Sequence, residues 1–217
     1  MKRIVIIGAG GHGRGILEIL RAAASDRSDP PMVHGFLDDD PDRTGSTVGG
    51  VSVLGTTELM PQLASEFRFL IGVGDPDPRR AVAERVLEAG GEFALAVHPS
   101  AVIYGDVSLG PGTVIGAGAV VAANTSFGPQ CLVNLGATVG HDCRLAAYAT
   151  VAPGSNLGGF VTMEEGSFVG LGGVVVPGKT IGSWSKLGPG SVLLEDLAPD
   201  RIAFGVPARV VDRRKRR

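Results

Sequence analysis

Between Ile103 and Ala198 the sequence repeats every six residues without an insertion. The first position of each of these 16 hexads is apolar, and the fifth position is small in most of them. The first positions are Ile103, Leu109, Ile115, Val121, Phe127, Val133, Val139, Leu145, Val151, Leu157, Met163, Val169, Val175, Ile181, Leu187 and Leu193. The small fifth positions include Thr113, Ala119, Thr125, Cys131, Ala137, Cys143, Ala149 and Ser155.

A period of six matches neither the 3.6-residue turn of an α-helix nor the two-residue alternation of an independent strand. It matches a solenoid of short parallel strands, in which each repeat buries its apolar face by stacking on its neighbours. Glycine recurs where such a chain turns a tight corner, as at Gly112 and Gly118, because glycine tolerates the backbone angles that a corner requires. The repeat therefore predicts a β-helix.

The composition indicates a folded protein, since 44% of the 217 residues are hydrophobic and 19% are charged. A net charge of −2 argues against nucleic-acid binding, and we interpret the basic run at residues 213–217 as a solvated end. Residues 1–3 precede only four apolar residues, so we expect no signal peptide, no membrane span and a cytoplasmic protein. Cys131 and Cys143 occupy inward positions, and we expect them to form neither a disulfide nor a metal site.

Residues 1–97 carry a different pattern, and we expect them to form a domain of their own before a solenoid domain at residues 98–217. Strand-like runs occupy residues 3–7, 33–37 and 69–73, and helix-like runs occupy residues 16–20 and 79–88. This alternation predicts a small parallel α/β domain. Only about three or four strands are expected before His98.

The first strand-like run leads into Gly8-Ala9-Gly10-Gly11-His12-Gly13, which fits the pattern G-x-G-x-x-G. Backbone N–H groups of such a turn, at the N-terminus of a helix, can bind a phosphate. Asp38 stands 25 residues after Gly13, where a carboxylate can accept hydrogen bonds from a sugar or a base. The small expected sheet favours a mononucleotide over a dinucleotide, and a glycine turn needed only for packing is the alternative.

The N-terminal motifs and the hexads stand in one order. The glycine string, Phe36-Leu37-Asp38-Asp39, Ile71-Gly72-Val73-Gly74 and His98-Pro99-Ser100-Ala101-Val102 precede hexads of the form [Leu/Ile/Val]-Gly-x-x-small-x. In this order the whole chain resembles the NeuD/PglD-type sugar acyltransferases, which are hexapeptide-repeat acyltransferases. The resemblance implies a Rossmann-like domain followed by a left-handed parallel β-helix with three hexads per coil. It also implies a homotrimer that binds acetyl-CoA between neighbouring solenoids.

The resemblance assigns a nucleotide-sugar site to the N-terminal domain. By position, the residues that lie along the sugar nucleotide would be Gly10, Gly11 and His12. The residues near its base would be Asp38 and Asp39, and the residue beside the base would be Gly74. We expect no metal at any site.

One hexad differs from the others by carrying Gly140-His141-Asp142-Cys143. Because the first and fifth positions point inward, His141 at the third position should point outward. Residues 18 apart stack if three hexads make a coil, so Ala123 should lie below His141 and Gly159 above it. Such small neighbours leave room for a reacting amine and a thioester, and the Gly159 N–H is available to an oxyanion. From spacing alone, a corner histidine without a function is an equal alternative.

The segment from Val139 to Cys143 matches the catalytic segment of the family. The match implies that His141 is a general base, which takes a proton as a sugar amine attacks the thioester of acetyl-CoA directly. It implies that Asp142 makes the histidine more basic and fixes its tautomer. Cys143 points inward, so we expect no acyl-enzyme.

Further positions match ligand contacts in the family. Asn134 matches a contact to the acceptor sugar, and the matches to acetyl-CoA contacts are Gly159, Leu171, Gly188 and Pro189. Nine residues after the base, members often carry a second histidine near the thioester, whereas this chain has Thr150, whose hydroxyl can still form hydrogen bonds. Residues 203–208 resemble the closing element of the family, and capping of the last coil is the alternative role.

The sequence therefore predicts an acetyl-CoA-dependent N-acetyltransferase that acts on the amino group of a nucleotide-linked amino-deoxy sugar in glycan biosynthesis. One alternative is O-acetylation of sialic acid or another sugar. Another is a scaffold that binds a sugar nucleotide without turnover. The expected partners are acetyl-CoA, the nucleotide-linked amino sugar and two further copies of the chain, with neither nucleic acid nor a membrane.

Overall fold

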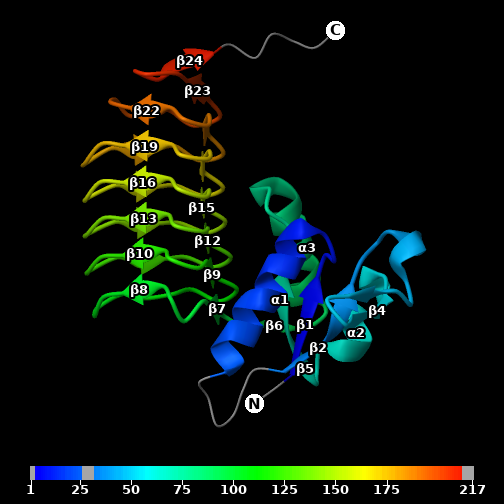
Figure 1. Cartoon of the computed structure of the whole chain (residues 1–217). Coiled ribbons are helices and arrows are strands. Elements are labelled where there is room, and N and C mark those ends of the chain that lie inside the picture. Colours follow the sequence, from blue (N-terminus) through cyan, green and yellow to red (C-terminus); the bar gives the residue numbers. More distant parts are fainter. Residues whose placement is uncertain (1–2, 26–31, 212–217) are drawn as a thin grey trace, which may run out of the picture. The chain divides into compact units, whose positions relative to one another are not determined.

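The computed structural model of the protein describes residues 3–25 and 32–211, so the basic run at 213–217 lies outside the described residues. The chain divides into two compact units, Met1–Pro99 and Ser100–Arg217 (Figure 1). The division falls two residues after the boundary that the sequence suggested, and each unit has an architecture of its own.

The N-terminal unit contains a twisted sheet with the strand order β3-β4-β2-β1-β5-β6. All neighbouring strands are parallel except β3 and β4, which form an antiparallel hairpin. The strands are β1 (Arg3–Ile7), β2 (Val33–Leu37), β3 (Thr47–Val48), β4 (Val51–Gly55), β5 (Phe67–Ile71), β6 (Glu92–Phe93) and, beyond this sheet, β7 (Ala96–Val97). The helices are α1 (Gly11–Ala24), α2 (Met60–Leu63) and α3 (Pro76–Glu88), with 3₁₀ turns η1 (Pro41–Arg43) and η2 (Thr57–Leu59).

The prediction of a parallel α/β domain is confirmed, but the expectation of three or four strands is wrong. The sequence signal missed β3 and β6 because two residues are too few to show a period, and it missed β4 in a glycine-flanked loop region. Strand β5 also begins at Phe67, two residues earlier than expected. Helix α3 begins at Pro76 rather than near residue 79, because the Asp75 carboxylate caps it by accepting a hydrogen bond from the Asp77 N–H.

Apolar residues alternate between the two faces of this sheet. One face packs against α2 and α3 through a cluster of Val5, Ile7, Leu37, Met60, Ala64, Phe67, Phe69 and Val86. Helix α1 buries Ile16, Leu17, Ile19 and Leu20, and its Gly13 lies next to Ile6, whose neighbours Val5 and Ile7 point to the other face. The domain thus has helices on both faces of a mostly parallel sheet, which is a Rossmann-like arrangement.

The C-terminal unit is a triangular parallel β-helix in which partner residues on successive coils are 18 apart, as Val121 and Val139 are. Figure 1 shows one column of its strands, labelled β8 to β22. This β13 face comprises β8 (Val102–Ile103), β10 (Val120–Val121), β13 (Thr138–Val139), β16 (Asn156–Leu157), β19 (Val174–Val175) and β22 (Val192–Leu193). The β14 face comprises β11 (Ser126–Phe127), β14 (Arg144–Leu145), β17 (Thr162–Met163) and β20 (Thr180–Ile181). The β15 face includes β9 (Val114–Ile115), β12 (Leu132–Val133), β15 (Thr150–Val151), β18 (Phe168–Val169) and β21 (Lys186–Leu187).

The hexad pattern predicts the interior of this solenoid correctly. First positions from Ile115 to Leu193 are at most 5% exposed, and the fifth positions from Thr113 to Ser155 are at most 1% exposed. Ile103 and Leu109, in the first coil, are only half-buried. The period therefore encodes which side chains point inward, and by exclusion which ones face outward.

The regular spacing ends at the C-terminal side of the solenoid. Strand β23 (Ile202–Phe204) pairs in parallel with β21, and it pairs in antiparallel fashion with β24 (Arg209–Val211). The Phe204 ring lies directly over Gly188, where a Cβ atom would come within 2.0 Å of it. This hairpin therefore covers the last coil on the β15 face.

No helix among residues 3–25 and 32–211 is both long and apolar enough to cross a membrane.

Candidate active site

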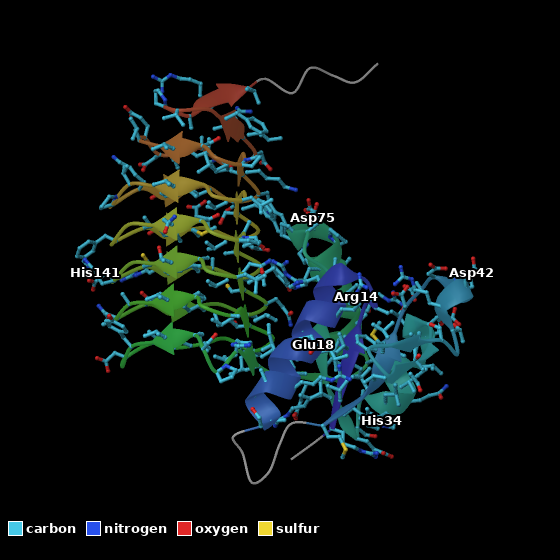
Figure 2. The ribbon with its side chains drawn as sticks, viewed as in Figure 1. Arg14, Glu18, His34, Asp42, Asp75 and His141 are labelled. Carbon is cyan, nitrogen blue, oxygen red and sulfur yellow. The ribbon has the colours of Figure 1, made fainter. Side chains whose placement is uncertain are left out.

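His141 lies at the corner between the β13 and β14 faces, and its side chain is 58% exposed. We call this corner, with residues 122–125, 140–143 and 158–161 on successive coils, the histidine corner. Figure 2 shows His141 at the edge of the coils and pointing outward. Its Nδ1 lies 2.7 Å from Oδ2 of Asp142, so Nδ1–H can donate to the carboxylate and leave Nε2 free to accept a proton.

Asp142 is held by two partners. It adopts a left-handed backbone conformation with φ 57°, and its second oxygen, Oδ1, accepts a hydrogen bond from the Asn124 side-chain amide. The hydrogen bonds from His141 and then from Asn124 hold the pKa of Asp142 below its ordinary value. The carboxylate is therefore ionised at neutral pH, and it faces the imidazole as an acceptor.

Above His141 the next coil presents a bare backbone. A Cβ atom on Gly159 would lie 2.7 Å from Nε2 of His141, so the imidazole rests against a position that only glycine leaves open. The Phe160 ring meets the imidazole edge-on, with centroids 5.0 Å apart and an interplanar angle of 86°. The structure thus brings together His141, Asp142 and Gly159, which the sequence had singled out.

Sequence reasoning missed Asn124 and Phe160. Both stand 18 residues from Asp142, one coil below and one coil above it, and both have positive φ angles, as Asp106 has two coils below. The 18-residue spacing was available from the sequence and identifies this column. What it did not give is the direction in which each side chain points from its corner.

A hollow of about 590 Å³ lies beside this corner, on the β14 face. Its lining is mostly polar and comprises Asp106, Ser108, Asn124, Thr125, Ser126, Asp142, Arg144, Phe160 and Thr162. The Asp142 carboxylate and the Phe160 ring therefore border open space whose volume lies within the range of small-ligand sites.

Other predicted contacts lie on a different corner, between the β15 and β13 faces, which we call the leucine corner. It holds residues 134–137, 152–155, 170–173 and 188–191, and with them Asn134, Leu171, Gly188 and Pro189. Asn134 accepts a hydrogen bond from the Leu135 N–H at 2.8 Å, and Leu171 is 60% exposed. Thr150 lies on β15, and its hydroxyl donates to the Tyr148 carbonyl at 3.4 Å. One whole face of the solenoid separates these residues from His141.

The two cysteines belong to the solenoid interior. Cys131 and Cys143 are both buried and take part in no disulfide, and burial raises the pKa of the Cys143 thiol. A buried, protonated thiol is a poor nucleophile. Among the described residues, no group of three His, Cys, Asp or Glu side chains is arranged to hold a metal ion.

In the N-terminal unit the glycines of the β1–α1 turn serve two purposes. A Cβ atom on Gly13 would lie 1.8 Å from the Gly8 carbonyl oxygen, and one on Gly72 would lie 2.6 Å from the Gly13 Cα. These glycines allow β1, α1 and β5 to approach closely. In contrast, a Cβ atom on Gly10, Gly11 or Gly74 would meet no other atom within 4 Å. The predicted ligand-binding glycines are thus those that border open space.

Asp38 connects β2 to the glycine turn. Its Oδ2 accepts a hydrogen bond from the Ala9 N–H at 2.7 Å, and its Oδ1 accepts one from the Asp40 N–H at 3.0 Å. Arg43 lies 3.7 Å from Oδ2. Asp38 therefore fixes the turn itself, a role that the spacing did not reveal.

Asp39, the next residue, contacts Thr57 and Arg85 instead of the glycine turn. Its Oδ1 accepts hydrogen bonds from the Thr57 N–H at 2.8 Å and from the Thr57 hydroxyl at 2.6 Å, and Arg85 lies 3.7 Å from Oδ2. Burial raises the pKa of Asp39, but the Thr57 hydrogen bonds and the Arg85 charge outweigh it and lower the pKa overall. Asp39 is therefore an anion at neutral pH.

His12 stands in the first turn of α1. Burial, and after it the positive charge of Arg79, lower the pKa of His12 to about 4. Arg79 is 2% exposed and donates hydrogen bonds to the carbonyl oxygens of Val73 and Gly74. His12 is thus neutral at neutral pH, and it can offer a phosphate a hydrogen bond but no positive charge.

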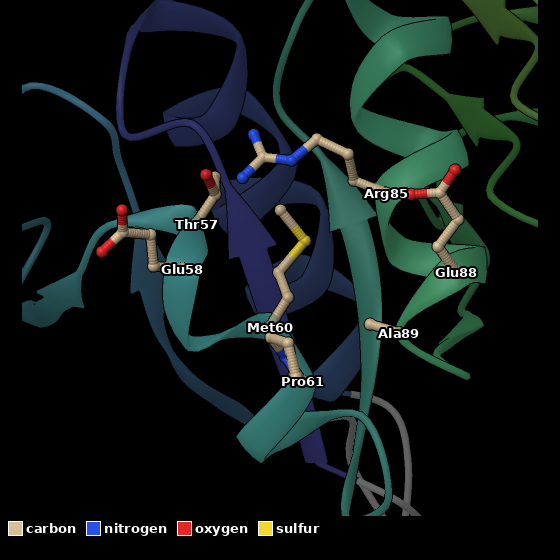
Figure 3. Close-up of a pocket in the computed structure, with 7 residues that line it drawn as sticks. All are labelled: Thr57, Glu58, Met60, Pro61, Arg85, Glu88 and Ala89. Atoms are coloured by element: carbon tan, nitrogen blue, oxygen red, sulfur yellow. The ribbon is translucent and has the colours of Figure 1, made fainter.

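A second hollow, of about 480 Å³, lies between η2, α2 and the end of α3 (Figure 3). It is lined by Thr57, Glu58, Met60, Pro61, Arg85, Glu88 and Ala89. Figure 3 shows the Arg85 guanidinium extending over Met60 toward Thr57. Since Thr57 and Arg85 both contact Asp39, this hollow adjoins one of the two predicted base-binding acids, and the sequence did not indicate it.

Comparisons with known proteins match both units. Residues 3–86 match the family model described as the PglD N-terminal domain. Over 115 residues the chain is 35% identical to UDP-N-acetylbacillosamine N-acetyltransferase of Bacillus subtilis (strain 168), a stretch that covers 53% of this chain. The match spans about half, 51%, of that curated relative.

Solved structures match the chain over nearly its whole length. The perosamine N-acetyltransferase of Caulobacter crescentus, in complex with CoA and GDP-perosamine, has a TM-score of 0.90, 36% identity and 98% coverage of both chains. Its structures include variants in which a histidine is replaced by asparagine or alanine. The acetyltransferase domain of PglB from Neisseria gonorrhoeae has a TM-score of 0.87 and 32% identity, with 97% of this chain and 100% of that one covered. A further structure of that domain contains acetyl coenzyme A.

Proposed function

The chain belongs to the NeuD/PglD-type sugar acyltransferases, and from this membership we propose that it is an acetyltransferase for a nucleotide-linked amino-deoxy sugar. Acetyl-CoA is the acyl donor and the sugar amine is the acceptor. The observation that carries the proposal is the contact of His141 with Asp142, with Nε2 against the bare backbone of Gly159. A cytoplasmic location accords with the use of acetyl-CoA.

The proposed chemistry is direct transfer. The lone pair of the sugar amine attacks the thioester carbonyl carbon, and Nε2 of His141 accepts a proton from the nitrogen as the C–N bond forms. The carbonyl oxygen becomes an oxyanion, which the Gly159 N–H is placed to stabilise. The C–S bond then breaks, and the CoA thiolate takes up the proton from His141 to leave as the thiol. Asp142 stays ionised and holds the imidazole in the tautomer with a proton on Nδ1.

The nucleotide is assigned to the glycine turn of the N-terminal unit. The open positions Gly10, Gly11 and Gly74 leave backbone groups accessible to a diphosphate, with α1 contributing the N–H groups at its N-terminus. Neutral His12 would donate a hydrogen bond there. The base lies by Asp38 and Asp39 in this assignment.

The separation of the two corners supports a trimer. His141 and Gly159 occupy the histidine corner, whereas Asn134, Leu171, Gly188 and Pro189 occupy the leucine corner, and the β13 face lies between them. A ligand that touches both sets within one site therefore requires the histidine corner of one chain and the leucine corner of another. Cyclic assembly of three copies satisfies this at three equivalent sites.

An acetyl-CoA consumption assay tests the proposal. The acceptors are GDP-, UDP- and dTDP-linked 4-amino-4,6-dideoxy sugars, with the corresponding 4-hydroxy sugars and free and CMP-linked sialic acid as comparisons. We expect thiol release only with an amino sugar, and a trimer in sedimentation velocity at micromolar concentration. Turnover of hydroxyl acceptors alone would mean O-acetylation, tight nucleotide-sugar binding without acetyl-CoA binding would mean a scaffold, and a monomer would remove the shared site.

A further inference from the structure

We propose that Asn124 is a positioning residue for the His141 base, acting through Asp142. The catalytic part of this proposal rests on the proposed function, whereas the hydrogen bonds of Asn124 and His141 to Asp142 do not depend on it. The Asn124 amide donates to Oδ1 of Asp142, while Oδ2 of the same carboxylate lies 2.7 Å from Nδ1 of His141. The three side chains form one chain of hydrogen bonds that ends at Nε2.

The carboxylate alone does not fix the imidazole. Asp142 is half-buried, with its side chain 31% exposed, and without a second partner its carboxylate could rotate between rotamers. The amide donor on Oδ1 selects the rotamer in which Oδ2 faces Nδ1. Holding a base within a fraction of an ångström of its working position is worth a large part of its effect, so the donor matters although it touches no substrate.

The solenoid supplies the alignment that this requires. Asn124 and Asp142 are 18 residues apart, occupy the same corner on successive coils, and share almost the same φ, 58° and 57°. The backbone of the lower corner is tied to the upper one by the hydrogen bond from the Asp142 N–H to the Ala123 carbonyl at 3.0 Å. The side chains of the two corners therefore leave the backbone in parallel directions, with the amide directed at the carboxylate.

The charged environment of Asp142 explains why a neutral donor is suited to the task. In the adjoining hollow, the charged residues are Arg144 on β14 and Asp106 two coils below, and the neighbouring corner segments 122–125 and 158–161 carry no charge. A cationic partner at position 124 would compete with His141 for the carboxylate, and an anionic one would repel it. Asparagine binds the carboxylate, tolerates the left-handed backbone, and leaves its negative charge to act on the imidazole.

A purely structural reading of Asn124 is that its left-handed corner favours asparagine. Two variants separate the readings, since both accept the backbone angle. Asn124→Gly removes the donor, and Asn124→Asp keeps the shape but replaces the donor by an acceptor. The matched control is Asp200→Gly, which removes an exposed side chain from a corner with φ 58° in the last coil, remote from His141.

The first measurement is independent of turnover. Long-range ¹H–¹⁵N NMR of the imidazole, assigned against His141→Asn, reports the tautomer and titration midpoint of His141 in the full-length protein. We expect a dominant Nδ1–H tautomer in the wild type and in Asp200→Gly, and a mixture in Asn124→Gly. In Asn124→Asp the added negative charge should move the midpoint to higher pH.

The second measurement is steady-state kinetics. We expect kcat to fall about tenfold in Asn124→Gly, with the KM values for both substrates and the melting temperature close to those of the wild type. The acid limb of the kcat profile should move upward in pH in Asn124→Asp. Unchanged tautomer, midpoint and kcat in both Asn124 variants would overturn the proposal, and so would an equal loss in Asp200→Gly. If the wild type acetylates no amino sugar, the proposed function fails, while the NMR result still decides the role of Asn124.

Discussion

The histidine corner of the solenoid and the glycine turn of the α/β domain both depend on missing side chains, but for different reasons. In the solenoid, position 159 has no room for a side chain because the imidazole of His141, from the coil below, occupies that space. In the glycine turn, position 13 has no room for a side chain because the Gly8 backbone occupies that space. A Cβ atom on Gly10, in contrast, would have no neighbouring atom within 4 Å. A repeat of fixed period tells which residues face each other, so a functional glycine can be recognised from spacing. A single loop gives no such register, and its packing and binding glycines look alike in sequence.

The sharpest test of the solenoid side is His141→Asn. Asparagine keeps a hydrogen-bonding side chain of similar reach but accepts no proton near neutral pH, so kcat should fall by about two to four orders of magnitude with small changes in KM. Steady-state kinetics measure this, and binding of acetyl-CoA and of the nucleotide sugar by calorimetry serves as the control. Retention of more than about a tenth of wild-type turnover would show that His141 is not the base.

The glycine turn is tested by comparing Gly13→Ala with Gly10→Ala. The Gly13 methyl group would lie 1.8 Å from a backbone oxygen that cannot rotate away, so we expect a loss of about 2 kcal/mol in the free energy of unfolding. Gly10 has φ −75° and free space around it, so alanine should leave stability within about 0.5 kcal/mol and raise the KM for the nucleotide sugar instead. Thermal or urea unfolding and kinetics separate the two. Equal destabilisation by both substitutions would mean that Gly10 is also a packing residue.

In the solenoid, Gly159→Ala should reduce kcat less than His141→Asn does. The new methyl group would lie 2.7 Å from Nε2 and displace the imidazole, so kcat should fall about tenfold while the melting temperature changes little, because the exposed ring can move aside. Gly105→Ala is the matched control, since Gly105 stands two coils below His141 and its Cβ atom would meet nothing within 4 Å. Wild-type activity in Gly159→Ala would argue against the space above Nε2 as the site of reaction.

The sequence predicted far more of the solenoid than of the α/β domain, and the reason is physical. Hexad positions dictate burial, so the outward direction of His141 and its stacking on Gly159 followed from counting residues. In the α/β domain, β3 and β6 are two residues long and their existence depends on tertiary pairing rather than on local pattern. The hydrogen bond of Asp38 to the Ala9 N–H likewise joins positions 29 residues apart with no repeat to relate them.

Even in the solenoid, spacing had a limit. Asn124 and Phe160 were missed although each stands 18 residues from Asp142. The spacing gave neither the side-chain direction nor the hydrogen bond, because both depend on rotamers selected by neighbouring residues. The hollow near Asp39 could not be predicted for a related reason. Its walls come from η2, α2 and α3, and no pattern in the sequence shows that these segments lie together in the fold.

Asp142→Asn tests the smallest of these effects, which is the contribution of the Asp142 charge to the basicity of the His141 imidazole. The pKa of Asp142 lies below its ordinary value, so the group is a carboxylate throughout the neutral range and its charge favours the protonated imidazole. Asparagine tolerates φ 57°, so the corner should keep its shape. Removing the charge leaves a less basic imidazole, which loses its proton at lower pH. The acid limb of the kcat profile should therefore move to lower pH, with a severalfold fall in kcat at its plateau.

The sign of that shift is the informative result, because a loss of orientation alone would lower kcat without moving the limb. Asp200→Asn changes an acid in an equivalent backbone conformation far from His141, and it should leave both the limb and the plateau unchanged. An acid limb that stays in place or moves upward in Asp142→Asn would contradict the electrostatic role. Asp142 would then act on His141 only as a hydrogen-bond acceptor, and the charge at this corner would have no part in setting the basicity of Nε2.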